Sequence, residues 1–144
     1  MERLQTLFEK YSGKKEYSIS PLPSSGGNRQ YFRIIWDSGS CIAVAGTSLR
    51  ENSAFLYLAG HFSRLGLPVP EILAVSGDGM YYLQEDLGDT TLFDAVAAGR
   101  RSGEYSPEEK TLLRAAVEAL PAFQYVGAQG LDFSQCGPVS CFDR

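Results

Sequence analysis

A glycine-containing run at residues 24–29 lies between two segments with the character of β-strands, and this position limits what the chain can fold into. Residues 17–22 alternate between apolar and polar side chains, and residues 31–36 are rich in aromatic and β-branched ones. A doubly wound dinucleotide-binding fold would need the glycines to open a helix, whereas here they lead into a strand. The run therefore predicts the loop of an antiparallel hairpin.

Further strand patterns extend this hairpin into a sheet. The predicted strands are residues 17–22, 31–36, 41–45, 71–75 and 81–85. The third is almost entirely apolar, which indicates burial on both faces, and the last two flank a glycine-containing turn. Because a single long helix interrupts these antiparallel strands, the pattern is typical of an α+β domain.

The helices are indicated by their apolar spacing and their caps. Residues 3–11 predict a short helix. Ser48 and Glu51 have the spacing of a capping box before an apolar stripe that ends at Gly66. Thr90 and Thr91 precede a short helix that we expect to end near Gly99.

The clearest helix start is Ser106, which is followed by Pro107 at the first helical position. We expect this helix to run to about residue 125, with Pro121 kinking or ending it. Its apolar stripe is Leu112, Leu113, Ala116 and Leu120. If this stripe has no cover, we expect the chain to self-associate through residues 107–125.

Composition excludes several classes of function. The 144 residues carry a net charge of −4, with no basic face of the kind that binds nucleic acid. Cys41, Cys136 and Cys141 form no metal-ligand pattern, and we expect free thiols. The first residues lack the apolar run of a signal peptide, and no stretch is apolar enough to cross a membrane. We expect a cytoplasmic protein with no membrane or nucleic-acid partner.

Three places carry residues suited to binding a nucleotide. The glycine loop, Ser25, Gly26, Gly27, Asn28 and Arg29, can direct backbone N–H groups at a phosphate, and Arg29 and Arg33 add charge. The connector Gln84, Glu85, Asp86 and Leu87 offers backbone groups that can read the edge of a base. Ala43 leaves room for a flat ring, and Glu51 lies in the first turn of a helix. Each also has a plain structural interpretation: a hairpin loop, a solvated connector and a helix cap.

Together these segments resemble the small lobe of the aminoglycoside phosphotransferase family, which has the protein-kinase fold. The resemblance runs from about Pro23 to Leu92 and is best in residues 25–33, 66–72 and 83–89. The branch most similar is that of the bacterial cell-wall amino-sugar kinases. The resemblance implies ATP and Mg²⁺ as cofactors, with adenine at residues 84–87 and against Ala43, and the phosphates under residues 25–29.

The sequence departs from the family pattern at two points. A lysine usually follows the adenine-lining alanine by two residues, but Ala45 stands there, and Arg29, Arg33 or Arg50 is left to supply the charge. The family's catalytic His-x-Asp loop is also missing, since the single histidine, His61, lies in a predicted helix, where we expect it to be half-exposed. Asp132 begins a short Asp-Phe-Ser segment that only superficially matches the metal-binding Asp-Phe-Gly.

We therefore expect residues 1–88 to form a kinase-like small lobe and residues 89–144 the first helices of an incomplete large lobe. The parent activity would be transfer of the γ-phosphoryl group of ATP to a hydroxyl of a sugar-like acceptor. We assign no catalytic or metal-binding residue within the chain and expect it to be inactive alone. Two alternatives stay open: a non-catalytic binding module of kinase-like shape, and a kinase for choline, an aminoglycoside or another small alcohol.

Overall fold

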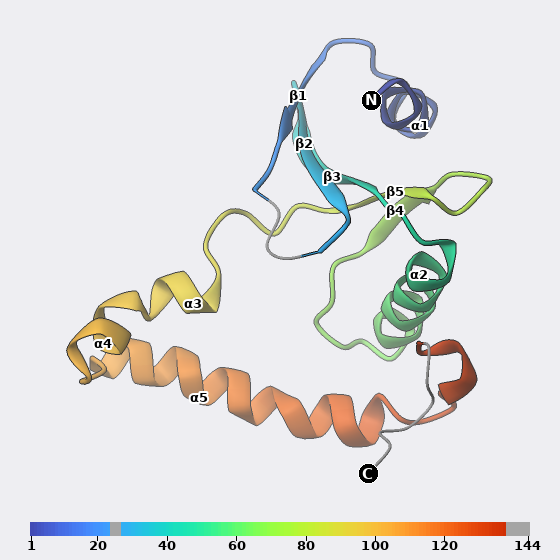
Figure 1. The fold of residues 1–144 in the computed structure, drawn as a ribbon. Coiled ribbons are helices and arrows are strands. Elements are labelled where there is room, and N and C mark those ends of the chain that lie inside the picture. Colours follow the sequence, from blue (N-terminus) through green and yellow to red (C-terminus); the bar gives the residue numbers. More distant parts are fainter. Residues whose placement is uncertain (24–26, 138–144) are drawn as a thin grey trace. The chain divides into compact units, whose positions relative to one another are not determined.

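A computed structural model describes residues 1–23 and 27–137, and it has an α+β architecture (Figure 1). A five-stranded antiparallel sheet and several helices confirm the expected fold class. The chain divides into two compact units. The first comprises Met1–Asp86 with the described residues 131–137, and the second comprises Leu87–Gly130. The boundary falls within the predicted connector, and residues 131–137 group with the sheet instead of with the later helices.

The strands lie in the order β1-β2-β3-β5-β4, so β3 is central. Their bounds are Tyr17–Pro21 (β1), Gln30–Trp36 (β2), Gly39–Ala45 (β3), Ile72–Val75 (β4) and Tyr81–Glu85 (β5). All neighbouring pairs are antiparallel, and β4 carries an irregularity between Ile72 and Ala74. The apolar sequence of β3 is explained by its place, because a central strand with helices on both faces is buried on both.

The two helices of the first unit cover opposite faces of the sheet (Figure 1). Helix α1 (Glu2–Ser12) buries Leu4 and Phe8 against one face of β3, β4 and β5. Helix α2 (Leu49–Arg64) packs Phe55 and Leu56 on the other face. We call these the α1 face and the α2 face of the sheet. Because side chains alternate along a strand, each residue of β3 belongs to one face only.

Ser48 caps α2, but the capping box predicted there is only half formed, because the Glu51 carboxylate makes no return bond to a described residue. The Ser48 hydroxyl accepts a hydrogen bond from the N–H of Glu51 (3.3 Å), and Thr91 caps a short helix in the same way. Helix α5 (Pro107–Pro121) begins with a complete capping box between Ser106 and Glu109. The predicted helix before it is instead two short ones, α3 (Leu92–Ala95) and α4 (Ala97–Ser102).

Pro121 ends α5 earlier than the apolar pattern suggested. The chain continues as a π-helical turn over Ala122–Val126, in which the Gly127 N–H donates to the Ala122 carbonyl. The helix cannot keep its regular bonding through proline, because proline has no N–H to donate. Several apolar side chains of α5 are exposed: Leu112 (44%), Val117 (64%) and Leu120 (54%). That exposure agrees with the expectation of an uncovered stripe, and self-association stays a prediction.

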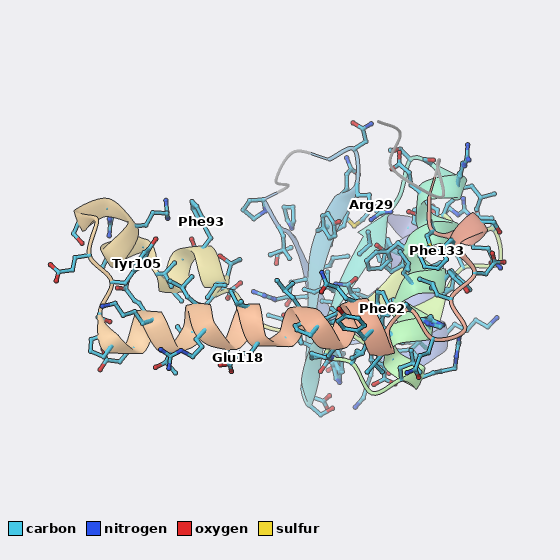
Figure 2. The ribbon with its side chains drawn as sticks, turned by 90° about the horizontal axis from the view of Figure 1, so that it is seen from below. Arg29, Phe62, Phe93, Tyr105, Glu118 and Phe133 are labelled. Atoms are coloured by element: carbon cyan, nitrogen blue, oxygen red, sulfur yellow. The ribbon has the colours of Figure 1, made fainter. Side chains whose placement is uncertain are left out.

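The second unit is held together by the buried carboxylate of Glu109. It accepts hydrogen bonds from the N–H of Gly99 (2.9 Å) and of Ser106 (2.9 Å), which lowers its pKa. A side chain at Gly99 would meet the ring of Tyr105 at 2.3 Å, so this glycine permits close packing. Phe93 lies under the guanidinium of Arg100, and Figure 2 shows Phe93 and Tyr105 at this end of the unit.

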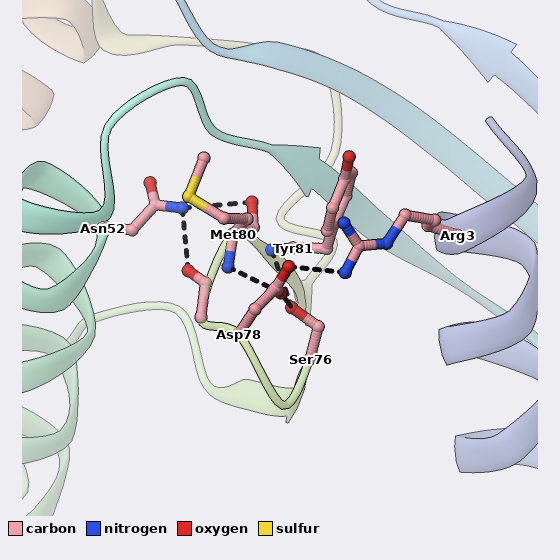
Figure 3. Close-up of polar contacts among 7 residues, drawn as sticks. Arg3, Asn52, Ser76, Asp78, Met80 and Tyr81 are labelled. Carbon is pink, nitrogen blue, oxygen red and sulfur yellow. Dashed lines mark hydrogen bonds and ion pairs between the residues drawn. The ribbon is translucent and has the colours of Figure 1, made fainter.

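Two buried polar residues of α2 were not predicted. His61 was expected to be half-exposed, but only 6% of it is accessible, because the rings of Tyr57 and Phe62 pack against it. Asn52 is fully buried and donates to the carbonyls of Gly79 (3.0 Å) and Met80 (3.1 Å), which ties α2 to the turn before β5 (Figure 3). In the part of the chain that the structure describes, no helix is long and apolar enough to cross a membrane.

The turn between β4 and β5 is closed by the carboxylate of Asp78 (Figure 3). It accepts hydrogen bonds from the Ser76 hydroxyl (2.6 Å) and the Met80 N–H (3.2 Å), and Arg3 of α1 pairs with its other oxygen. The Ser76 bond, with smaller contributions from Arg3 and Met80, lowers the pKa of Asp78 from 3.8 to about 2.

This lowered pKa predicts how stability depends on pH. Because the folded pKa lies below the unfolded one, the contribution of Asp78 is complete above pH 4 and is lost as the pH falls toward 2. The difference in free energy of unfolding between the wild type and Asp78→Asn should therefore shrink over this range. Urea unfolding at pH 5, 4, 3 and 2 measures it. A difference that stays constant would show that the paired turn adds no pH-dependent stability.

Candidate functional site

The α2 face of the sheet carries polar, aromatic and aliphatic side chains in two neighbouring rows. Strand register and alternation place the residues of each row side by side across the strands. One row is Arg33, Ile42, Gln84 and Ile72, and the other is Tyr31, Val44, Tyr82 and Val75. The row of Tyr31 lies toward the glycine loop, and the row of Arg33 lies toward the connector after β5.

Four buried side-chain polar atoms have no hydrogen-bond partner among the described residues; one is Oδ1 of Asn52, and the other three lie around these rows. These three are Nε of Arg29, the hydroxyl oxygen of Tyr82 and Oε1 of Gln84. Leaving a buried donor or acceptor unpaired costs about 1–3 kcal/mol, so such groups are uncommon in folded proteins and cluster where a ligand or water binds. The Tyr82 ring is fully buried, and this burial raises the pKa of its hydroxyl to about 12. Tyr82 is therefore a neutral donor at neutral pH.

Arg29 connects the glycine loop with the start of α2 (Figure 2). Its Nη2 donates to the backbone carbonyl of Glu51 (3.0 Å), and its guanidinium carbon lies 5.2 Å from the centre of the Phe55 ring. The Phe55 ring in turn stacks on Tyr82, with ring centres 5.3 Å apart. Both contacts fix the guanidinium while leaving its charge without a carboxylate partner among the described residues. Arg29 also lies close enough to Tyr82 for its charge to act on the Tyr82 hydroxyl.

Arg33, which the sequence suggested could add charge beside a phosphate, pairs with a carboxylate in the structure. Its guanidinium forms a two-pronged ion pair with Asp86, with Nε–Oδ2 at 2.8 Å and Nη2–Oδ1 at 3.0 Å. The side chains are only 16% and 7% exposed. This pairing directs the charge of Arg33 to the connector instead of to a phosphate. The side chain of Asp86, which the sequence interpretation did not use, therefore fixes the end of β5 to β2.

Ala43 lies on the opposite face from Arg33 and Gln84. It is fully buried on the α1 face, in one cluster with Leu4 and Phe8. Helix α1 packs over Ala43, so this residue does not share a face with Arg33 and Gln84. The role of Ala43 beside a flat ring stays a prediction, because the sequence does not say which face of a strand buried on both sides meets a ligand. The residues of β3 that point to the α2 face are Ile42 and Val44.

The other predicted residues that the structure describes lie before β2, at the start of α2 and around the end of β5. Ser25 and Gly26 lie outside the described residues, and Gly27 and Asn28 are exposed just before β2. The carboxylate of Glu51 is exposed and makes no hydrogen bond to the described residues, while its N–H serves the helix cap. The N–H of Glu85 donates to the Glu71 carbonyl (2.8 Å), and Leu87 is 68% exposed.

The loop and the connector flank the same stretch of β3. Gln30, the first residue of β2, pairs with Ala45, and Glu85 at the end of β5 pairs with Cys41. Four residues of strand separate these points, or about 13 Å at roughly 3.3 Å per residue. That span is comparable with the length of an extended nucleotide. The described part of the loop and the connector therefore lie at opposite ends of the same stretch of β3.

The carboxylate of Asp132 is used within its own turn. It accepts hydrogen bonds from the N–H of Ser134 (3.1 Å) and from Nε2 of Gln135 (2.9 Å), so it caps its own turn. The Asp132 N–H donates to the Tyr57 hydroxyl (2.7 Å). The described residues contain no group of three histidine, cysteine or acidic side chains that could hold a metal ion.

A cavity of about 520 Å³ lies elsewhere, between α1 and the start of the β4–β5 turn. Arg3, Lys10, Tyr11 and Val75 contribute to its lining. None of the three unpaired atoms of the α2 face reaches it, and Arg3 is already paired with Asp78. We place the candidate site on the α2 face for these reasons.

Sequence reasoning missed Tyr82 and Phe55 as site residues. The only available signal was alternation: Tyr82 and Gln84 occur two apart in a strand, so both had to share a face. Phe55 belongs to the apolar stripe of α2, and its stacking on Tyr82 depends on the packing angle of that helix, which the sequence does not show.

Comparison with known proteins gives one similarity. No protein-family model matches the chain, and no solved structure does. A segment of 116 residues is 31% identical to the N-acetylmuramate/N-acetylglucosamine kinase of Pseudomonas aeruginosa. The match covers 78% of this chain and 31% of that enzyme, so the chain spans about a third of the length of this relative. The similarity indicates a distant relationship to a kinase.

Proposed function

We propose that the chain is the ATP-binding part of a small-molecule kinase of the aminoglycoside phosphotransferase type. The observation that carries the proposal is the group of three buried, unpaired polar atoms on the α2 face, at Arg29, Tyr82 and Gln84. Two are donors at the loop end, suited to an anion, and the third is an acceptor near the connector, suited to an amino group. A nucleotide would satisfy both kinds. The distant similarity to a sugar kinase supports the same proposal.

In this proposal the base lies near the connector and the phosphates near the glycine loop. Oε1 of Gln84 would accept from a purine amino group, and the backbone of residues 85–87 would contribute to reading the base edge. The ion pair of Arg33 with Asp86 holds that backbone in place. Glycines at residues 26 and 27 would allow the loop to approach the phosphates.

The whole protein would transfer the γ-phosphoryl group of ATP to a hydroxyl of a sugar-like acceptor. When bound, Mg²⁺ would neutralise charge on the phosphates. We place its protein ligands and the residue that positions the hydroxyl outside the described residues of this chain. An amino sugar is the acceptor that the similarity favours, and choline, an aminoglycoside or another small alcohol are the alternatives. Residues 1–88 and 89–144 would then correspond to the small lobe and the start of the large lobe.

One observation favours a second candidate, a non-catalytic binding module of kinase-like shape. Ala45 occupies the place of the usual phosphate-binding lysine, and the Glu51 carboxylate makes no hydrogen bond or ion pair with the described residues. A protein that had lost phosphoryl transfer would need neither the lysine nor its ion pair with the helix glutamate. This candidate keeps the shape of the site and predicts no affinity for ATP.

Calorimetric titration of the 144-residue protein separates the two candidates. We expect ATP and adenosine to bind, ATP with a Kd in the range of about 1 μM to 1 mM that is usual for enzyme substrates. Gln84→Ala should weaken both ligands by roughly five- to tenfold, because it removes one hydrogen bond. Lys10→Gln serves as the control: it removes a cation from the cavity beside α1 and should leave both affinities unchanged. Absence of binding by either ligand at several times this range would favour the non-catalytic module.

A further inference from the structure

The absence of a lysine at position 45 raises the question of which group takes the phosphate charge. Three arginines lie close to the loop in sequence or across the sheet: Arg29, Arg33 and Arg50. The structure distinguishes them by their surroundings. The guanidinium of Arg33 donates two hydrogen bonds to the carboxylate of Asp86. Arg50 is exposed on the first turn of α2.

Arg29 differs from both. It is partly buried, it lies against the Phe55 ring, and the contact that holds it is a neutral backbone carbonyl. Its positive charge is therefore not neutralised by that contact, while Nε lacks a partner among the described residues. A partly buried guanidinium in this state is costly to leave unpaired and gains strongly from an anion.

Tyr82 supplies a second donor at the same place. Its ring stacks on the same Phe55 side chain that Arg29 covers, and its hydroxyl is buried without a partner among the described residues. Because the row of Tyr82 is the one on the loop side of the α2 face, both donors border the loop end of the site.

We propose that Arg29 and Tyr82 form the phosphate-binding pair of this site and take over the role of the absent lysine. The inference rests on the proposed function. Nε of Arg29 would donate a charge-assisted hydrogen bond to a phosphate oxygen of the nucleotide, and the Tyr82 hydroxyl would donate a neutral one. Phe55 and the Glu51 carbonyl hold the guanidinium before the ligand arrives, which reduces the entropy lost on binding. The pair is specific for the phosphate part of the ligand and does not contact the base.

The pair can be tested by separating stability from binding. Tyr82→Phe removes a buried hydroxyl that has no partner, so we expect a melting temperature equal to or above that of the wild type. The same change should weaken ATP binding by about tenfold and leave adenosine binding unchanged. A tyrosine with a purely structural role would give the opposite pattern, with lower stability and unchanged affinity. Circular dichroism melting and calorimetric titration provide the two readouts.

The charge is tested by Arg29→Gln, with Arg29→Lys as the conservative variant. We expect Arg29→Gln to weaken ATP by about 100-fold and adenosine by less than twofold, and Arg29→Lys to recover part of the loss. Arg50→Gln is the matched control. It removes an exposed arginine from the first turn of α2, beside the Glu51 carbonyl that Arg29 contacts, and should change ATP affinity by less than twofold. Inorganic tripolyphosphate is titrated as a third ligand and should follow ATP in all variants.

Titrating ATP, adenosine and tripolyphosphate separately distinguishes failure of the phosphate-binding pair from failure of the nucleotide-binding function. If the wild type binds ATP and adenosine, and Tyr82→Phe and Arg29→Gln bind ATP as well as the wild type, the pair is wrong and the nucleotide site stands. A larger loss in Arg50→Gln than in Arg29→Gln would also overturn the pair. If tripolyphosphate binds in an Arg29-dependent way and adenosine does not bind, the pair stands and the nucleotide function fails. Binding of none of the three ligands would dismiss both.

Discussion

Replacing Asp86 by alanine is expected to lower the free energy of unfolding of the first unit by about 3–5 kcal/mol. The carboxylate is only 7% exposed and receives two hydrogen bonds from Arg33, which is itself only 16% exposed. Removing it leaves a guanidinium in a poorly solvated place with its main partner gone. The cost is therefore that of a buried charge without compensation, and not that of one hydrogen bond.

Urea unfolding measures this loss, and the chain contains a matched control. Lys14 and Asp37 also form an ion pair, with Nζ–Oδ1 at 3.0 Å, but these side chains are 41% and 70% exposed. Asp37→Ala should cost less than about 1 kcal/mol. The double change Arg33→Met with Asp86→Leu should recover much of the stability, because it removes both charges together. Equal losses of unfolding free energy for Asp86→Ala and Asp37→Ala would show that burial does not decide how much an ion pair contributes to stability.

Much of the architecture follows from local patterns in the sequence. The alternation in residues 17–22, the aromatic and β-branched run in 31–36 and the apolar run in 41–45 each became a strand within two residues of the predicted bounds. The caps at Ser48 and Ser106 formed because they need only a side chain and a backbone N–H three residues later. Signals of this kind do not depend on the rest of the fold.

What the sequence could not give was the choice of face and of partner. Ala43 and Val44 are both fully buried, and only the placement of α1 and α2 tells which of them can meet a ligand. Arg33 was predicted to serve a phosphate, whereas its partner Asp86 lies 53 positions away in the sequence. Such long-range pairs come from strand order, which periodicity leaves open. The unpaired state of Tyr82 was invisible for the same reason.

The site also illustrates why buried polar atoms are a more specific signal than sequence motifs. The glycine loop by itself is compatible with an ordinary hairpin, and the connector with a solvated link. Three unpaired polar atoms around one face of the sheet, each costing about 1–3 kcal/mol in the free protein, are harder to explain without a bound partner. Stability lost in the free state is recovered on binding, which is how a preorganised site gains affinity.

The second large effect is expected at Gly46, which follows β3. A Cβ atom placed there would lie 2.2 Å from Nδ2 and 2.4 Å from Oδ1 of Asn52. Asn52 is fully buried, and its amide is held by the carbonyls of Gly79 and Met80 (Figure 3). The amide cannot move aside without breaking these bonds. Gly46→Ala should therefore lower the free energy of unfolding by about 2–4 kcal/mol, through overpacking and lost hydrogen bonds.

A double-mutant cycle tests that the cost arises from this one contact. Asn52→Ala should itself destabilise the protein by about 2–3 kcal/mol, because the amide that ties α2 to the β4–β5 turn is lost. In the Asn52→Ala background the added methyl group at position 46 has room. The loss of unfolding free energy in the double variant should therefore be at least 1 kcal/mol smaller than the sum of the losses in the two single variants.

Gly60→Ala on α2 is the matched control for the change of glycine to alanine. There the new Cβ would have only the end of the Arg64 side chain nearby, at 3.6 Å, which is an ordinary contact. Alanine is favoured over glycine inside a helix, so this variant should gain about 0.5–1 kcal/mol. Opposite signs at positions 46 and 60 would assign the loss at Gly46 to the buried amide of Asn52. Simple additivity of Gly46→Ala and Asn52→Ala would instead place the strain in the backbone, and the link between β3, α2 and the β4–β5 turn would then need another cause.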